Sequence, residues 1–221
     1  MLCQKNLNKL QISYLTLKKM RFSYFVPIIV LFALLPFISI GYVIADGMVE
    51  STYTQTFIDF QRFIPFFCTW WIMFSLNEYV EGKGRELLYI YKKSLLSDYL
   101  LLFFWYMLHV VVLLIGYHIF MDSYWMDLIL LLIQSCFLSA LSFFLMICFR
   151  TISVSFLIVL LYEIFCIFSN YGILRWINIF SIRRIENISQ LFPHYILVLI
   201  FSIVMIIMGN VLYKRMTTAY R

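Results

Sequence analysis

The chain has 221 residues, of which 64% are hydrophobic, 20% aromatic and only 13% charged. A soluble domain carries about 25% charged residues, so this chain has too little polar surface to cover a water-soluble globule, and it is too apolar to be disordered. Its seven glycines exclude a collagen-like or low-complexity protein. The composition therefore predicts an all-α, polytopic membrane protein.

Charged residues divide the sequence into apolar stretches long enough to cross a bilayer. A hydrocarbon core about 30 Å thick needs roughly 20 helical residues. Four stretches reach this length without a charge, a fifth contains one acid (Glu163), and the shortest lies between Phe63 and Asn77. We therefore predict six transmembrane helices within a single domain of residues 1–221, at residues 22–45, 60–79, 99–121, 127–149, 151–170 and 193–213.

The basic residues predict how these spans are oriented. Six spans place both termini on one side of the membrane. If that side is the cytoplasm, only four of the 17 lysines and arginines lie outside: Arg62, Arg175, Arg183 and Arg184. The positive-inside rule therefore predicts cytoplasmic termini, and the net charge of +6 indicates topology rather than nucleic-acid binding.

Residues 1–21 mix leucines and aromatic residues with lysines. This pattern is typical of an amphipathic helix on the inner membrane surface, and the alternative is a frayed basic tail. No P-loop, no G-x-S-x-G turn and no H-E-x-x-H pair occurs. The five cysteines include no C-x-x-C pair, and the three histidines are dispersed. We therefore expect a chain that is not an enzyme and binds no cofactor or metal itself.

The longest inner loop, residues 80–96, follows the second predicted span. Gly82 and Gly84 bracket Lys83 and permit a sharp turn. Apolar residues then recur at helical spacing, at Leu87, Leu88, Tyr91 and Leu95. A short amphipathic helix with charges of both signs is suited to dock into a groove on a soluble protein, and the alternative is a solvated turn.

The six predicted spans, the basic N-terminal helix and this loop together resemble the permease subunit of type-2 ATP-binding-cassette (ABC) exporters. In that family an acidic residue, a glycine and a basic residue follow the second span, and a leucine-containing helix leads into the third. The corresponding residues are Glu78 and Glu81, Gly82 and Gly84, Lys83 and Arg85, and Leu87 and Leu88. The proline that many members carry before the third span is absent, and Lys92-Lys93-Ser94 is the nearest match.

The resemblance implies a multi-pass permease of the bacterial plasma membrane, paired with an identical or a second permease. A separate cytoplasmic ABC ATPase subunit would bind ATP and Mg and move a coupling helix at residues 81–91. The coupling residues implied are Glu81, Lys83, Arg85, Glu86, Leu87, Leu88 and Tyr91. The expected activity is export of hydrophobic or amphipathic substrates, such as peptide toxins, bacteriocins or lipids. The alternatives are the substrate-binding membrane component of a vitamin importer and a non-transporting membrane enzyme or sensor.

Two further features are candidates for the substrate pathway. Glu163 lies within a span, where a charge costs about 2.5–3.5 kcal/mol, so we expect it either to face the pathway or to be protonated and hydrogen-bonded to a hydroxyl. The resemblance places the second span at the dimer interface. Its aromatic residues are then candidates for a channel wall, and packing or lipid contact is the alternative: Phe67, Trp70, Trp71 and Phe74.

Residues 171–192 combine apolar residues with arginines and resemble the outer re-entrant segment that precedes the last span in this family. The expected role is an outer gate that includes Trp176, Arg183 and Arg184. The alternative is an amphipathic connector on the membrane surface.

Overall fold

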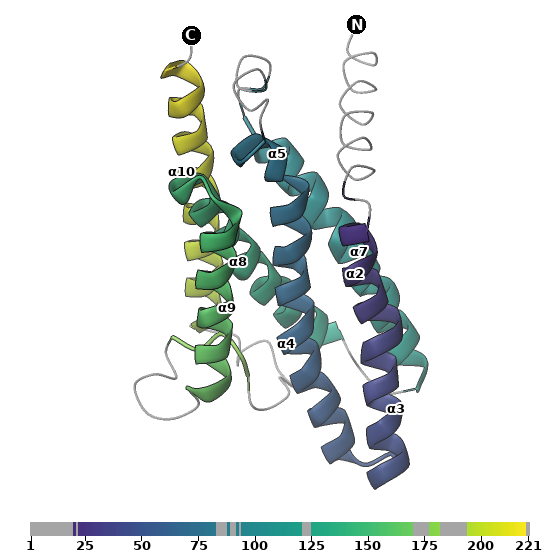
Figure 1. Cartoon of the computed structure of the whole chain (residues 1–221). Coiled ribbons are helices and arrows are strands. Elements are labelled where there is room, and N and C mark those ends of the chain that lie inside the picture. The colour runs from purple at the N-terminus through teal and green to yellow at the C-terminus, as the bar shows by residue number, and fades with distance from the viewer. Residues whose placement is uncertain are drawn as a thin grey trace, which may run out of the picture.

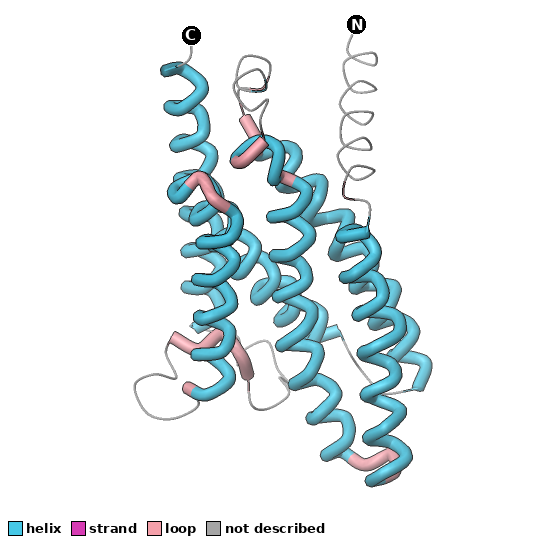
Figure 2. Tube along the Cα trace, viewed as in Figure 1, coloured by secondary structure: helices cyan, strands magenta, loops and turns pink. Residues whose placement is uncertain are grey.

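The computed structural model describes residues 20, 22–82, 88, 92, 94–120, 125–169, 177–181 and 194–219. Of these residues 89% are helical and none lies in a strand, which confirms the predicted all-α class. The described helices form one bundle (Figures 1 and 2). They are α2 (Phe22–Ile29), the π-helix η1 (Val30–Leu34), α3 (Leu35–Asp46), α4 (Glu50–Ser75), α5 (Asn77–Val80), α7 (Leu96–Phe120), α8 (Trp125–Phe149), α9 (Ile152–Phe168) and α10 (His194–Ala219).

The long helices run in alternating directions, so the connections gather at the two ends of the bundle. At one end α2 begins, α5 lies, α8 turns into α9 and α10 finishes (Figure 1). We call this the α5 end. At the opposite end α3 turns into α4, and we call this the α3–α4 end.

Four helical stretches are long and apolar enough to cross a membrane: Phe22–Asp46, Leu96–His118, Met126–Phe149 and His194–Thr218. They correspond to the first, third, fourth and sixth predicted spans. α4 and α9, at the second and fifth predicted spans, do not meet this standard, because α9 has only 17 residues and the 26-residue α4 carries Glu50, Asp59 and Arg62. The total of six spans therefore stays a prediction.

Two helices extend well beyond the predicted spans. α4 begins at Glu50 rather than at residue 60, and its polar first half packs beside α3. α10 continues past Lys214 and Arg215 to Ala219. In both cases the predicted span stops at charged residues, but a helix forms its own backbone hydrogen bonds and does not end where the apolar stretch ends.

α4 and α8 occupy the centre of the bundle, and α8 packs against α4, α7, α9 and α10. Small polar residues on α8 are fully buried: Ser135, Ser139 and Ser142. Such residues let the backbones of neighbouring helices approach closely inside a membrane. The Ser139 hydroxyl also lies 2.8 Å from the Tyr99 hydroxyl of α7, so it has a polar partner in the core.

The close approach of α10 to α8 depends on Gly209. A Cβ atom there would lie 2.9 Å from the ring of Phe143, which is fully buried. We predict that Gly209→Ala destabilises the protein by about 1–3 kcal/mol, the usual cost of overpacking. The measurement is the thermal unfolding temperature in detergent. Gly116→Ala is the control, because a Cβ at Gly116 meets no atom within 4 Å. Equal unfolding temperatures for the two variants would contradict this packing.

Candidate functional site

At the α5 end, Glu81 links the segment after α5 to the start of α9. Its Oε1 accepts a 2.6 Å hydrogen bond from the backbone N–H of Ile152, the first residue of α9. The first N–H groups of a helix have no partner within it, and negative charge is favourable there. The turn between α8 and α9 is tight, with Arg150 in the left-handed region at φ 56°. Glu81 therefore caps α9 from a different part of the chain.

The chain is fixed again where it returns to the bundle before α7. Lys92 forms an ion pair with Asp98 in the first turn of α7, and its ammonium lies 3.3 Å from the hydroxyl of Tyr79. The Ser94 hydroxyl donates a 2.8 Å hydrogen bond to Asn210 Oδ1 on α10. The connection from α5 to α7 is thus bonded to α9 at its start and to α7 and α10 at its end.

Of the predicted coupling residues, the structure describes Glu81 and Leu88. Leu88 is half-buried against the core, and its carbonyl accepts a 2.8 Å hydrogen bond from the N–H of Lys92, four residues on, as in one helical turn. The others lie outside the described residues: Lys83, Arg85, Glu86, Leu87 and Tyr91. The coupling helix therefore stays a prediction, and only its attachment points are described.

The predicted pathway aromatics of α4 divide between two faces of the helix. Trp71 is fully buried, with its ring centroid 4.7 Å from that of Tyr24 on α2 and 5.7 Å from that of Tyr106 on α7. The other three are half-buried neighbours: Phe67, Trp70 and Phe74. The Trp70 ring centroid lies 5.6 Å from that of Phe156 on α9. Trp71 therefore packs into the bundle away from the cluster that contacts α9.

Glu163 lies on the buried face of α9, in line with Val159 and Cys166, and 8% of its surface is exposed. This helix packs against α8 and α4. Among the described residues, no hydrogen bond or ion pair to the Glu163 carboxyl is found. A buried charge is costly unless it is paired, so the carboxyl group must be neutralised by a proton or bonded by water or a ligand. Its expected role in the pathway remains a prediction.

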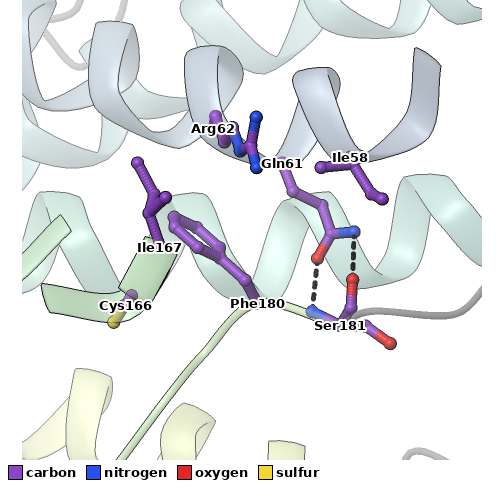
Figure 3. Close-up of a pocket in the computed structure, with 7 residues that line it drawn as sticks. All are labelled: Ile58, Gln61, Arg62, Cys166, Ile167, Phe180 and Ser181. Atoms are coloured by element: carbon purple, nitrogen blue, oxygen red, sulfur yellow. Dashed lines mark hydrogen bonds between the residues drawn. The ribbon is translucent and has the colours of Figure 1, made fainter. Parts of the chain in front are cut away.

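At the α3–α4 end, side-chain amides from two helices hold the non-helical segment 177–181, and Figure 3 shows one of them, Gln61, bonded to Ser181. Gln61 of α4 pairs twice with Ser181: its Nε2 donates to the Ser181 carbonyl (2.9 Å), and its Oε1 accepts from the Ser181 N–H (2.7 Å). Gln134 of α8 donates to Gln61 Oε1 (2.8 Å) and to the Ile179 carbonyl (2.7 Å). Both glutamines are buried. They bond backbone groups that no helix bonds.

α9 fixes the start of the same segment. Asn178 Nδ2 donates a 2.7 Å hydrogen bond to the carbonyl of Cys166, and the Tyr162 hydroxyl donates one of 2.8 Å to the carbonyl of Ile177. Asn178 Oδ1 in turn accepts from the N–H of Phe180 at 2.8 Å. The segment is therefore hydrogen-bonded to α4, α8 and α9.

A small pocket of about 70 Å³ lies between α4, α9 and this segment (Figure 3). Its lining residues are Ile58, Gln61, Arg62, Cys166, Ile167, Phe180 and Ser181. Arg62 forms a 3.5 Å ion pair with Asp59, so its charge is balanced from within α4. The pocket has room and polar partners for a few water molecules but not for a peptide or a lipid.

Sequence reasoning missed Gln61 and Gln134. The signal was present for Gln134, because a primary amide within an apolar span is expensive in lipid unless it is hydrogen-bonded to the protein. Gln61 lies between Asp59 and Arg62, where an amide does not stand out. The predicted outer-gate residues Trp176, Arg183 and Arg184 lie outside the described residues. The segment 177–181 falls within the range predicted to be re-entrant.

No protein-family model, no curated protein and no solved structure matches this chain. Within the described ranges, no group of three or more histidine, cysteine, aspartate or glutamate side chains is placed to hold a metal ion.

We predict that Glu81→Ala lowers the stability of α9 by about 0.5–2 kcal/mol, the usual cost of losing a helix cap. Glu81→Gln is the control, because it keeps an oxygen that accepts from the Ile152 N–H. Thermal unfolding of the purified variants gives the comparison. If the alanine variant unfolds at the same temperature as the glutamine variant, the cap contributes nothing.

Proposed function

We propose that this chain is the membrane-spanning permease subunit of an ATP-driven ABC exporter. The permease pairs with a second copy or a related chain, and a separate cytoplasmic ATPase carries ATP and Mg. In this account the α5 end faces the cytoplasm. Four of the basic residues that the structure describes lie at the α5 end, and the positive-inside rule favours such residues on the cytoplasmic side: Lys92, Arg150, Lys214 and Arg215.

The observation that carries the proposal is the attachment of the connection between α5 and α7. Glu81 bonds its start to α9, and Ser94 and Lys92 bond its end to α10 and α7. A push on this connection from a docked ATPase is therefore applied to three helices at once. A loop that merely joins two spans does not need such bonds to helices distant in the sequence.

The proposed substrates are hydrophobic or amphipathic molecules, such as peptides or lipids. The half-buried ring cluster of α4 and α9 supports this class, because aromatic faces bind apolar surface without requiring hydrogen-bond partners. Glu163 lies on the same helix as Phe156 of that cluster and has no hydrogen-bond or ion-pair partner among the described residues. We assign it to the substrate pathway.

The coupling assignment is tested by reversing three charges in the loop, as Lys83→Glu, Arg85→Glu and Glu86→Lys. Like charges brought together at an interface cost several kcal/mol, so we expect the ATPase to be lost from the purified complex while the permease still inserts. The measurement is Mg-dependent ATP hydrolysis per mole of tagged permease. Lys214→Glu with Arg215→Glu, on α10, is the control and keeps the ATPase. Full co-purification of the triple variant would contradict the assignment.

The pathway assignment is tested with Glu163→Gln, which keeps the size of the side chain but cannot ionise or give up a carboxyl proton. We expect normal expression and a change in substrate export of at least about threefold, because an ionisable group inside a span is by default a functional one. Glu50→Gln, on an exposed residue of α4, is the control. Unchanged export by the Glu163 variant would remove this residue from the mechanism.

A further inference from the structure

We propose that Gln61 and Gln134 are positioning residues that hold segment 177–181 as a releasable seal over the Cys166 side chain. The use of this seal as an outer gate rests on the proposed function. The hydrogen bonds between the two glutamines and the segment, which we call its seat, and their release are properties of this chain alone.

The segment 177–181 is held through its backbone. The hydrogen bonds between the two glutamines and the segment join the amides to backbone atoms, at Ile179 and Ser181. The two amides bond the carbonyls of Ile179 and Ser181, which lie two residues apart in this non-helical segment. This arrangement fixes the position of the segment. It also explains why two costly amides are kept inside an apolar bundle, since non-helical backbone at membrane depth needs partners from the protein.

The seat borders a pocket with room for water. Gln61 and Ser181 both line the 70 Å³ pocket. When their hydrogen bonds break, water in the pocket replaces them, so the net cost of opening is much smaller than in a dry core. The seat is also incompletely satisfied, because the buried Gln134 Oε1 accepts no hydrogen bond from the described residues. Such a contact is suited to opening and closing.

The segment covers the side chain of Cys166. Cys166 is fully buried, lines the pocket, and is tied to the segment through the hydrogen bond from Asn178 to its carbonyl. Phe180 lines the same pocket between α4 and α9. Departure of the segment therefore exposes the Cys166 thiol, which makes this natural cysteine a reporter. Cys68 of α4 is equally buried but lies outside the pocket, so it reports general loosening of the bundle.

The experiment measures thiol labelling in whole cells with a membrane-impermeant maleimide added outside. The chain carries Cys166 as its single cysteine, and a parallel chain carries Cys68 alone, with all other cysteines replaced by alanine. We expect Gln61→Leu and Gln134→Leu each to raise the labelling rate of Cys166 about tenfold, which corresponds to about 1.4 kcal/mol. Gln55→Leu, earlier on the same helix, is the matched control and leaves the rate unchanged.

Three results would overturn the proposal. One is a Cys166 labelling rate that stays at the original value in both glutamine variants. Another is a parallel rise for Cys68, because the bundle as a whole has then loosened. The third is labelling of Cys166 in the glutamine variants only after the cells have been permeabilised, since the segment then does not seal the outer end.

Ser181→Pro gives a second, independent variant if the leucine variants fail to fold. Proline removes the Ser181 N–H, which donates a hydrogen bond to Gln61 Oε1, and position 181 lies outside the helices. The same rise in Cys166 labelling is expected, and an unchanged rate in the folded variant would refute the seal. None of these measurements needs an ATPase or a substrate, so they separate failure of the seal from failure of the proposed transport function.

Discussion

Everything in this structure depends on the need to bond backbone polar groups within the protein. An apolar bundle in lipid offers no water to unpaired N–H and C=O groups, so helices are the default and every departure from them requires a side-chain partner. The departures described here have such partners. Glu81 caps the start of α9, the Ser94 hydroxyl accepts from the N–H of Leu96 at the start of α7, and Gln61 with Gln134 bonds the segment 177–181. Polar side chains thus bond the backbone at places where the helical hydrogen bonds stop.

α9 is the element that relates the two ends of the bundle to each other. Its first residue is bonded to Glu81 beside the predicted coupling helix, and near its last turn Tyr162 and Cys166 bond the segment 177–181. Its 17 residues span about 25 Å at 1.5 Å per residue. In the proposed exporter, a displacement applied at the cytoplasmic end therefore reaches the opposite end through one short, stiff helix, which also carries Glu163.

The sequence was sufficient for the helical class and for four apolar spans, because charges and hydrophobic length are local properties. It overlooked the polar first half of α4, since that part of the helix is not apolar. It also did not reveal which helices are neighbours. Glu81 bonds a residue 71 positions away and Gln61 one 120 positions away, and no periodic pattern encodes such pairs. In the sequence Gln134 is a single polar residue in an apolar stretch, and only the structure shows that Gln61 and Ile179 are its hydrogen-bond partners.

The central claim is that a separate ATPase drives this bundle through the connection between α5 and α7. The most direct measurement is ATP hydrolysis by the protein purified from its native membrane and reconstituted in lipid, with and without candidate peptides and lipids. The account predicts a co-purified ATPase whose turnover rises when a substrate is added. A chain that purifies alone, with no ATP hydrolysis under any of these conditions, would contradict it.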